Sequence, residues 1–375
     1  MKIGLICPYN MFQFAGGVQE IVIQLQKSLN KNGHQAIIIT PRPRAHLATA
    51  PKDYILVGRS TKMNTPFQTM VDFGFEADGD EIESFLKREN FDVLHFHEPW
   101  VPLLSRQILT KSKSVNVATF HATMPETVLS KSIISSVTPY TKSILKYLDS
   151  LTAVSESAAE YVKTLTRQPI NLVPNGIDLN KFKPKKLPYG YSKKSILYLG
   201  RLEKRKGVDY LLYAYAKLRE THSDVKLVIA GSGIKLKYLK KLVDQYEIPD
   251  VEFAGFIPEA NKADLMASAD LYCSPALYGE SFGIVLLESM AVGTPVVAGN
   301  NSGYASVMTG RGRLSLVNPK SIDDFAQRLE LMLYDEEIRQ LWRKWAYDEV
   351  KSYSFDKIAS MYEKVYLNAL KVHEK

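Results

Sequence analysis

The chain has 375 residues, which is more than one ordinary hydrophobic core holds, so its length predicts two domains. Hydrophobic residues make up 45% and charged residues 23%, a composition that excludes an intrinsically disordered chain. The net charge of +8 suits a phosphate-bearing ligand or an anionic membrane surface and selects neither of them.

The first predicted unit runs from the strand KIGLICP through a loop to a helix over residues 18–32 and then to the strand QAIIIT. This order is typical of a doubly wound α/β domain, in which ligands lie at the carboxyl ends of parallel strands. Gly16 and Gly17 in the loop fit either a backbone that approaches a phosphate or sugar closely or a simple tight turn. No GxGxxG fingerprint of a dinucleotide site is present.

The first predicted strand and the two cysteines indicate in which cellular compartment the protein is expected. The apolar run after Lys2 meets Pro8 at once, so we expect a strand and its loop here and not a signal peptide. No stretch approaches the roughly 20 uninterrupted apolar residues of a membrane span. Cys7 and Cys273 are far apart in apolar strand contexts, so we expect no disulfide framework and a reducing cytoplasm.

Residues 41–80 contain four prolines, and we expect irregular loops there. A short amphipathic helix is predicted over residues 80–90, followed by the strand FDVLHFHEP. His95 and His97 alternate along this strand and therefore point to one face of the sheet. Such a pair can bind a metal, but no third ligand stands at a recognisable spacing, so the pattern favours packed or hydrogen-bonded histidines.

The next strand, NVATFH, places His121 at its carboxyl end, where a cleft residue or a structural histidine fits equally well. Residues 128–148 are predicted to be helical. Ser157 and Glu160 have the spacing of a capping box at the start of the following helix.

A linker is predicted over residues 183–195. The surrounding stretch KFKPKKLPYGYSKK carries six lysines together with prolines and a glycine, which fits a solvated hinge or a polybasic membrane contact. We therefore expect an N-terminal domain over residues 1–182 and a C-terminal domain over residues 196–353.

The second half repeats the strand, loop and helix order, with SILYLG, RLEKRKG and a helix over residues 208–221. The loop carries four cations at the carboxyl end of its strand: Arg201, Lys204, Arg205 and Lys206. A planar arginine fork and a lysine point charge both suit a pyrophosphate, while the alternative is an exposed basic loop. Helices are also expected from residue 322 to the end.

The stretch YGESFGIVLLESMAVGTPVVAG places Glu280 at the start of a helix predicted over residues 282–290. Glu288 follows about two turns later, roughly 12 Å away at 1.5 Å per residue. The unpaired amides of a helix start favour negative charge. The pattern suits a nucleotide-sugar, with one carboxylate on the sugar hydroxyls and the other on the ribose diol. The plainer alternative is a helix cap and a paired helix residue.

The chain resembles family 4 retaining glycosyltransferases with the GT-B fold, and within them most resembles phosphatidyl-myo-inositol mannosyltransferases. The pieces that carry the resemblance are CPYNMFQFAGGVQE, FDVLHFHEP, ATFHATM, VPNGIDLNKFKP, LGRLEKRKG, VIAGSG, ADLYCSPALYGESFGIVLLESMAVGTPVV and YSFDKIASMYEKVY. This implies two doubly wound Rossmann-like domains facing a central cleft, with a last helix over about residues 354–375 packing back on the first domain.

The resemblance also implies roles for particular residues. Arg201 and Lys206 hold the donor diphosphate, and Glu288 binds the ribose hydroxyls. The implied catalytic set is His121, Glu280, Arg201 and Lys206. The implied donor-binding set is Gly16, Gly17, Arg201, Lys206, Gly231, Ile257, Glu280, Ser281, Phe282, Gly283, Ile284 and Glu288. The implied acceptor set is Tyr9, Gln19, Trp100 and Thr123.

The implied reaction is retaining transfer of a hexose, mannose or glucose, from a nucleotide diphosphate sugar to a hydroxyl of a membrane lipid headgroup or glycolipid. GDP-mannose is favoured over UDP-glucose, with no cofactor, no metal and no nucleic-acid partner. The implied location is cytoplasmic and peripheral, at the inner face of the cell membrane. The alternatives are a soluble acceptor, a nucleotide-sugar epimerase or isomerase on the same scaffold, and a catalytically silent binding homologue.

The acceptor side departs from the lipid mannosyltransferase pattern. Glu126 stands where those enzymes carry a lysine, Trp100 stands in place of an asparagine, and acids outnumber bases in DEIESFLKRE. We therefore expect anionic lipid to be bound through other first-domain residues, namely Lys131, Lys142 and Lys146, with Trp100 or Phe73 entering the interface.

Overall fold

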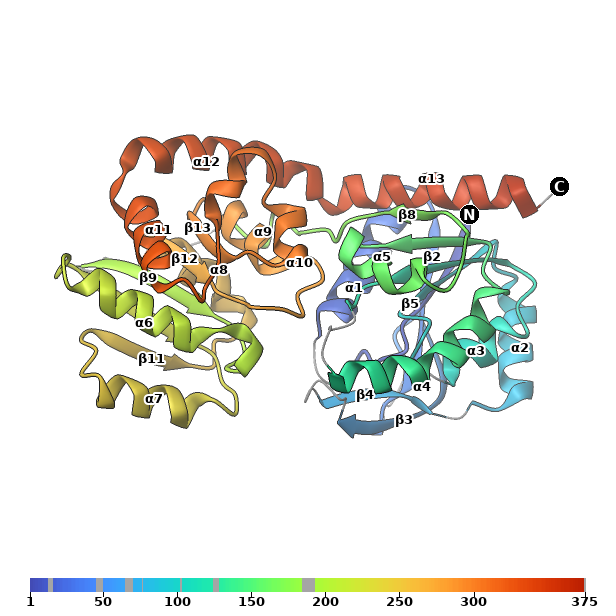
Figure 1. Ribbon diagram of the computed structural model, residues 1–375. Coiled ribbons are helices and arrows are strands. Elements are labelled where there is room, and N and C mark those ends of the chain that lie inside the picture. Colours follow the sequence, from blue (N-terminus) through green and yellow to red (C-terminus); the bar gives the residue numbers. More distant parts are fainter. Residues whose placement is uncertain are drawn as a thin grey trace. The chain divides into compact units, whose positions relative to one another are not determined.

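The computed structural model divides the chain into one unit of Met1–Gly176 with Phe355–Lys375 and a second of Ile177–Ser354. The residues described are 1–12, 16–44, 50–64, 70–75, 77–101, 103–123, 128–183 and 193–373. Most of the predicted linker, residues 184–192, lies outside them, as does Glu126. Each unit is a doubly wound α/β domain, as predicted, and is described by itself (Figure 1).

The first unit contains a sheet with the strand order β4-β3-β2-β1-β5-β6-β7-β8. Its strands are β1 (Lys2–Ile6), β2 (Gln35–Arg42), β3 (Tyr54–Asn64), β4 (Met70–Phe75), β5 (Val93–His97), β6 (Val115–Phe120), β7 (Ser150–Ala153) and β8 (Ile170–Leu172). All neighbours are parallel except β3 and β4, which are antiparallel. The prediction of irregular structure over residues 41–80 was wrong for Tyr54–Asn64 and Met70–Phe75, which form a hairpin. Pro51 precedes the first of these strands and does not interrupt it.

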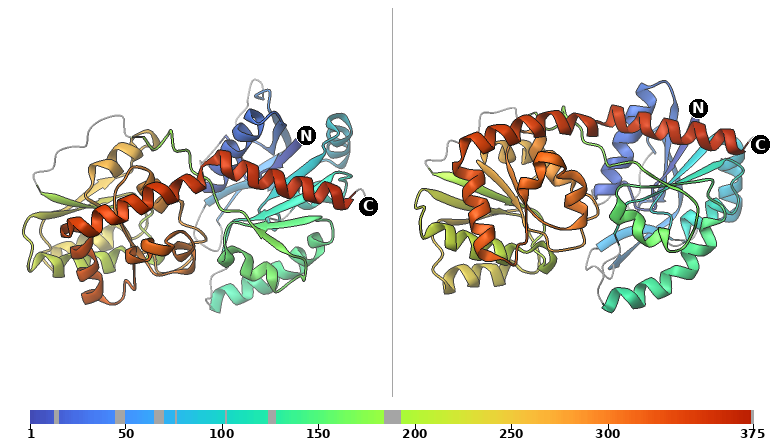
Figure 2. Two further views of the ribbon diagram at one scale, coloured as in Figure 1. Left: turned by 90° about the horizontal axis from the view of Figure 1, so that it is seen from above. Right: turned by 45° about the horizontal axis from the view of Figure 1, so that its top comes forward.

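Its helices are α1 (Gly17–Lys31), α2 (Gly79–Glu89), α3 (Leu104–Leu109), α4 (Val128–Leu145), α5 (Glu156–Lys163) and α13 (Phe355–His373). Apolar side chains of α1 and α13 pack together with alternate residues of β1, among them Leu25, Tyr362 and Leu5. Both views of Figure 2 show α13 (red) lying along this unit. The side chain that caps α5 is Ser155, whose Oγ accepts from the Ala158 amide at 3.1 Å, so the predicted capping box was placed two residues late.

The second unit contains a parallel sheet with the strand order β11-β10-β9-β12-β13-β14. Its strands are β9 (Lys194–Leu199), β10 (Val225–Ala230), β11 (Val251–Gly255), β12 (Leu271–Ser274), β13 (Val296–Gly299) and β14 (Leu316–Val317). Its α-helices are α6 (Val208–Arg219), α7 (Leu236–Gln245), α8 (Lys262–Ser268), α9 (Ile284–Ala291), α10 (Ser302–Val307), α11 (Ile322–Tyr334) and α12 (Glu336–Val350).

The strand order reverses once in each parallel run, and the reversal marks where ligands bind. In the first sheet β1 lies between β2 and β5, and in the second β9 lies between β10 and β12. At such a point the loops after two neighbouring strands diverge to opposite faces and leave a crevice at their carboxyl ends. The loops after β9 and β12 contain the predicted cation loop and Glu280. The sheet order alone therefore brings these two segments to one crevice.

Candidate active site

The cations after β9 form a tight turn whose side chains reach Glu280. Residues Lys204–Lys206 make one 3₁₀ turn, η1. Arg205 Nη1 lies 2.6 Å from Glu280 Oε1, and Lys206 Nζ lies 2.7 Å from the same oxygen. The Leu277 amide donates to the Arg205 carbonyl at 2.8 Å and ties the turn to the loop after β12. Residues 74 positions apart thus meet because β9 and β12 are neighbours.

The charges in this cluster stabilise one another. Burial pushes the pKa of Glu280 upward, but Lys206 and Arg205 outweigh burial and hold that pKa below its ordinary value. Burial, together with Arg205 and Arg201, lowers the pKa of Lys206, and Glu280 opposes this lowering. The Glu280 carboxylate is therefore ionised at neutral pH and supplies the main charge that favours the protonated Lys206 ammonium.

Arg201 lies at the rim of this cluster. Its Nη1 is 2.9 Å from Glu203 Oε1, and its side chain is 46% exposed. The other oxygen of Glu203 lies 3.0 Å from Arg205 Nε. Glu203 therefore holds two guanidinium groups side by side, with the fork of Arg201 accessible to solvent. Arg205 was predicted only as one of the four cations of the loop, and Glu203 was not predicted at all, because a run of mixed charges does not show which side chains pair.

The helix after Glu280 starts at Ile284, two residues later than predicted, because Gly283 has a φ of 102° and cannot continue a helix. A Cβ on Gly283 would lie 2.7 Å from the Tyr304 ring, so the position also requires glycine on steric grounds. The Phe282 side chain is buried against Tyr353, with ring centroids 5.8 Å apart. Phe282 and Gly283 can thus reach a ligand only through their backbone amides, at a helix start that favours anions.

Glu288 lies on α9 and forms an ion pair with Lys262, the first residue of α8. Lys262 Nζ is 2.6 Å from Glu288 Oε1, while Glu288 Oε2 is buried with no hydrogen-bond partner among the described residues. Burial raises the pKa of Glu288, and Lys262 opposes this rise. An unpartnered carboxylate oxygen beside a cation is the arrangement that can accept from a hydroxyl. Lys262 is a residue of this candidate site that the sequence did not indicate.

Two further predicted donor residues lie after β10 and β11. Gly231 has a φ of 135°, and a Cβ there would meet the Gly200 carbonyl oxygen at 1.8 Å, so the loops after β9 and β10 touch through backbone alone. Ile257 follows β11 and is partly exposed. Both residues lie at the carboxyl edge that carries the cation turn.

In the first unit, the predicted residues gather after β1 and at the start of α1. Gly16 is the N-cap of α1, and Gly17 is its first residue; both are exposed. The Gln19 side chain accepts from the Gly16 amide and donates to the Asn10 carbonyl. Gln19 therefore braces the loop that carries Tyr9, and its predicted contact with an acceptor stays a prediction.

His121, after β6, is buried and held from two sides. Its backbone amide donates to Glu98 Oε1 at 2.7 Å, and its Nε2 lies 2.9 Å from His97 Nδ1. Burial raises the pKa of Glu98 to about 7, opposed by the amides of His121 and Ala122. Glu98 is only 1% exposed and has a φ of 52°, a conformation that few residues other than glycine adopt. Strain and a buried carboxyl group at one position are typical of a functional site.

His95 is packed and hydrogen-bonded, as its pattern indicated. His95 Nε2 lies 2.6 Å from Thr119 Oγ1, and His95 Nδ1 lies 2.8 Å from Tyr366 Oη of α13. Over the described part of the chain, no three or more His, Cys, Asp or Glu side chains are grouped so as to hold a metal ion.

Trp100 and Thr123 have packing partners in the same unit. The Trp100 ring is 5.7 Å from Phe120 and 5.6 Å from Tyr161, and the residue is only 8% exposed. The expectation that Trp100 enters a membrane interface was wrong, because the ring is part of the core. Thr123 Oγ1 donates to Ser157 Oγ at 3.2 Å. The side chain of Phe73 lies outside the described residues.

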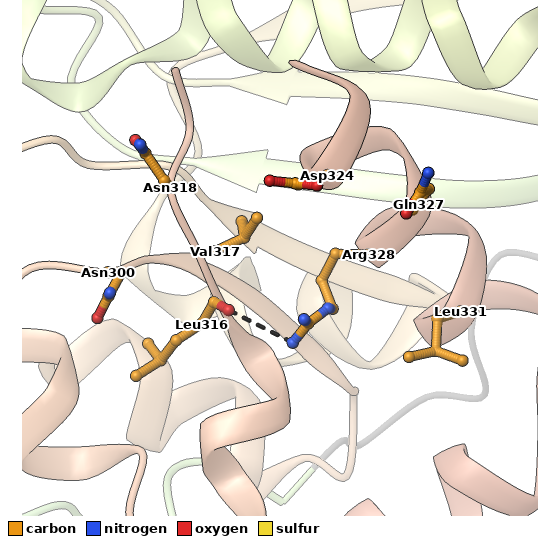
Figure 3. A pocket seen from close by; sticks show the side chains of 8 residues that line it. All are labelled: Asn300, Leu316, Val317, Asn318, Asp324, Gln327, Arg328 and Leu331. Atoms are coloured by element: carbon orange, nitrogen blue, oxygen red, sulfur yellow. Dashed lines mark hydrogen bonds between the residues drawn. The ribbon is translucent and has the colours of Figure 1, made fainter. Parts of the chain in front are cut away.

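A cavity of about 490 Å³ lies apart from these residues, between β14 and α11 (Figure 3). It is lined by Asn300, Leu316, Val317, Asn318, Asp324, Gln327, Arg328 and Leu331. One of the lining residues, Arg328, donates to the Leu316 carbonyl at 3.3 Å and also to the Leu314 carbonyl. Since that guanidinium is committed to the backbone, we assign no ligand to the cavity.

Comparison with known proteins matches both halves of the chain to glycosyltransferases. Residues 15–181 match the family model described as Glycosyltransferase Family 4, and residues 180–349 match that of glycosyl transferases group 1. The chain is 33% identical to the phosphatidyl-myo-inositol mannosyltransferase of Mycolicibacterium smegmatis, over 98% of this chain and 93% of that protein.

Solved structures show the same fold at lower identity. Sucrose-phosphate synthase from Thermosynechococcus elongatus superposes with a TM-score of 0.78 at 19% identity, over 99% of both chains. The Anabaena protein HepE, solved in complex with UDP-glucose, gives a TM-score of 0.71 at 16% identity, over 98% of this chain and 100% of its own. The chain therefore belongs to family 4 of the glycosyltransferases and has their two-domain GT-B fold.

Proposed function

We propose that this glycosyltransferase moves mannose from GDP-mannose to a hydroxyl of a membrane lipid headgroup, with retention of the anomeric configuration and without a divalent metal. The observation that carries the proposal is the cluster at the switch point of the second sheet. Arg205 and Lys206 share one oxygen of Glu280 there, with Arg201 beside them. Cations, a carboxylate and helix-start amides together match a sugar bound to a diphosphate.

The cluster supplies the electrostatic part of the reaction. When the bond between the sugar and the diphosphate breaks, negative charge develops on the departing diphosphate oxygen. Arg201 and Lys206 lie where they can bind that charge, and the amides at the start of α9 add fixed dipoles. Cationic side chains in this arrangement supply the charge stabilisation that a divalent metal gives in other enzymes.

The two glutamates divide the donor between them. Glu280 accepts hydroxyls of the hexose, and Glu288, held by Lys262, accepts the ribose diol through its unpartnered Oε2. No carboxylate in this cluster is free of a cation to act as a nucleophile on the sugar. A front-face displacement, in which the departing diphosphate assists the incoming hydroxyl, accounts for retention without one.

The lipid acceptor is supported by the relative that shares 33% identity, whose name states a phosphatidyl-myo-inositol substrate. Among the described helices, none is long and apolar enough to span a bilayer. Membrane contact is therefore proposed to be peripheral, through the exposed first-unit lysines Lys142 and Lys146. The predicted contribution of Lys131 concerns a side chain outside the described set. The acidic side chains of α2 repel an anionic membrane surface less than unpaired carboxylates would, because Glu81 pairs with Arg42 and Glu83 pairs with Lys111.

The proposal is tested by separating donor choice from acceptor choice. Thermal unfolding with equal concentrations of GDP-mannose, UDP-glucose or UDP-N-acetylglucosamine should show the largest stabilisation by GDP-mannose, since stabilisation rises with the logarithm of affinity. Transfer of radiolabelled mannose is then measured with phosphatidylinositol vesicles and with soluble inositol. Label in the lipid phase supports the proposal. Label found only in the soluble product would exclude the lipid acceptor. Isomerisation of the sugar nucleotide in the absence of any acceptor would exclude mannose transfer between these two substrates.

A further inference from the structure

His121 stands at the end of a row of buried rings that begins in α13. Tyr366 Oη lies 2.8 Å from His95 Nδ1, and the ring centroids of His95 and His97 are 4.1 Å apart. His97 Nδ1 lies 2.9 Å from His121 Nε2, with the two rings stacked at 24°. All three imidazoles are buried. Water therefore does not compete for the contact between His97 and His121.

This contact limits the ring nitrogens of His97 and His121 that can carry a proton to two arrangements. Burial lowers the pKa of His121 to about 4 and holds the pKa of His97 well below its ordinary value. Both rings are neutral at pH 7, and each has one N–H and one lone pair. A hydrogen bond between them needs one of each. Either His97 donates from Nδ1, or His121 donates from Nε2.

The other nitrogen of His97 distinguishes the two arrangements. His97 Nε2 is buried and has no hydrogen-bond partner among the described residues. If His121 donated, His97 would have to carry its own proton on that nitrogen. A buried N–H without an acceptor is costly and rare in folded proteins, whereas an unused acceptor is better tolerated. The arrangement in which His97 donates from Nδ1 is therefore the more stable one.

We propose that His97 is a positioning residue that holds His121 in the Nδ1–H tautomer. His121 then offers a neutral N–H donor to a ligand oxygen at the carboxyl end of β6, and Glu98 fixes the backbone from which it does so. A neutral donor binds a sugar hydroxyl or a phosphoryl oxygen without acting as a base. The identity of that ligand rests on the proposed function, but the tautomer does not.

The tautomer can be read directly from the full chain labelled with ¹⁵N-histidine. Spectra that detect two-bond couplings from ring nitrogens to ring protons distinguish a protonated Nδ1 from a protonated Nε2. The His121 signals are assigned by their loss in His121→Asn. We expect a protonated Nδ1 in the wild type between pH 6 and 8. A wild-type His121 protonated on Nε2 would overturn the proposal, whatever any variant does.

Variants of His97 test whether this residue determines the tautomer of His121. His97→Asn keeps an N–H donor at the position of Nδ1 and should leave the His121 tautomer unchanged, whereas His97→Leu should shift it toward Nε2–H. His95→Asn is the control, since it alters the same row of rings without touching His121, and should leave the tautomer as it is. An unchanged tautomer in folded His97→Leu would also overturn the proposal.

Steady-state kinetics provide a second test of the positioning role of His97. Relative to wild type, His97→Leu should lower kcat/KM for transfer about tenfold or more, the loss of one hydrogen bond aimed at the ligand, and His97→Asn should recover most of it. A structural role alone would lower thermal stability in both variants without this split. If the tautomer is as proposed but no form of the protein transfers mannose, the proposed substrates are wrong and the positioning role of His97 stands.

Discussion

Replacing Lys262 with methionine should destabilise the second unit by an amount that depends on pH. Lys262 Nζ lies 2.6 Å from Glu288 Oε1, and the two side chains are only 16% and 8% exposed. Methionine fills most of the space of the lysine stem but removes the charge. The buried carboxylate then loses its nearest counter-ion, and burial alone raises its pKa further.

Proton uptake limits the size of the loss. Starting from the ordinary value of 4.5, protonating the carboxyl group at pH 7 costs at most about 3.4 kcal/mol, and at pH 5 about 0.7 kcal/mol. The variant's folded state has the higher pKa and binds more protons than its unfolded state, so its stability falls as pH rises above the unfolded value. The midpoint of thermal unfolding should therefore drop by up to roughly 7–14 °C at pH 7, but only by roughly 1–3 °C at pH 5.

Differential scanning calorimetry at pH 5, 6 and 7 measures this difference. The double variant Lys262→Met with Glu288→Gln is the matched control, because it has no carboxyl group at position 288 to protonate. Its loss of stability should therefore not grow between pH 5 and pH 7. The reasoning is refuted if Lys262→Met alone loses the same stability at pH 5 and pH 7. That result would mean that the ion pair does not determine the protonation of Glu288.

The other predictions concern the donor, the metal and the membrane. Arg201→Ala and Lys206→Ala should each weaken GDP binding about 10- to 150-fold in calorimetric titration, because each removes a charge-assisted contact of roughly 1.5–3 kcal/mol. Lys217→Ala, on the exposed face of α6, is the control and should leave GDP affinity unchanged. Unchanged affinity in both site variants would exclude Arg201 and Lys206 from the donor site. Transfer activity should survive EDTA, and a loss restored by magnesium or manganese would refute the metal-free mechanism. Cosedimentation with anionic vesicles should weaken as salt rises, and should fall further in Lys142→Ala/Lys146→Ala than in Lys217→Ala, with about 1 kcal/mol lost per lysine. Equal binding to neutral vesicles would favour a soluble acceptor.

The fold was predictable because its signals are local. Apolar strands followed by glycine loops and amphipathic helices recur in both halves, and that alternation alone indicates doubly wound domains. The hairpin of β3 and β4 was missed because prolines were taken as a sign of irregular structure, although they stand outside its strands. The start of α9 was set too early, because an apolar pattern does not show that Gly283 has a positive φ.

The candidate site could be predicted as a set of residue types after successive strands, but the contacts between those residues could not. Glycines, cations and carboxylates after successive strands indicate an anion-binding edge whatever the strand order is. Which cation meets which carboxylate depends on that order, so the contact of Lys206 with Glu280 and that of Lys262 with Glu288 had no local signal. The contact of His97 with His121 is of the same kind, since it requires β5 and β6 to be neighbours in register.

The pairing of Glu280 with its two cations stabilises the proposed diphosphate site before a ligand binds. Arg201, Arg205 and Lys206 bring three positive charges, and Glu203 and Glu280 bring two negative charges, so the cluster carries a net charge of +1. Without Glu280, burial would favour loss of the Lys206 proton, and the ligand would meet a weaker cation. Glu280 thus has two roles in the proposed reaction: its carboxylate keeps Lys206 charged before the donor binds, and it faces the hexose afterwards. The remaining positive charge attracts the diphosphate, while the shared oxygen of Glu280 holds Arg205 and Lys206 in the geometry in which they receive it.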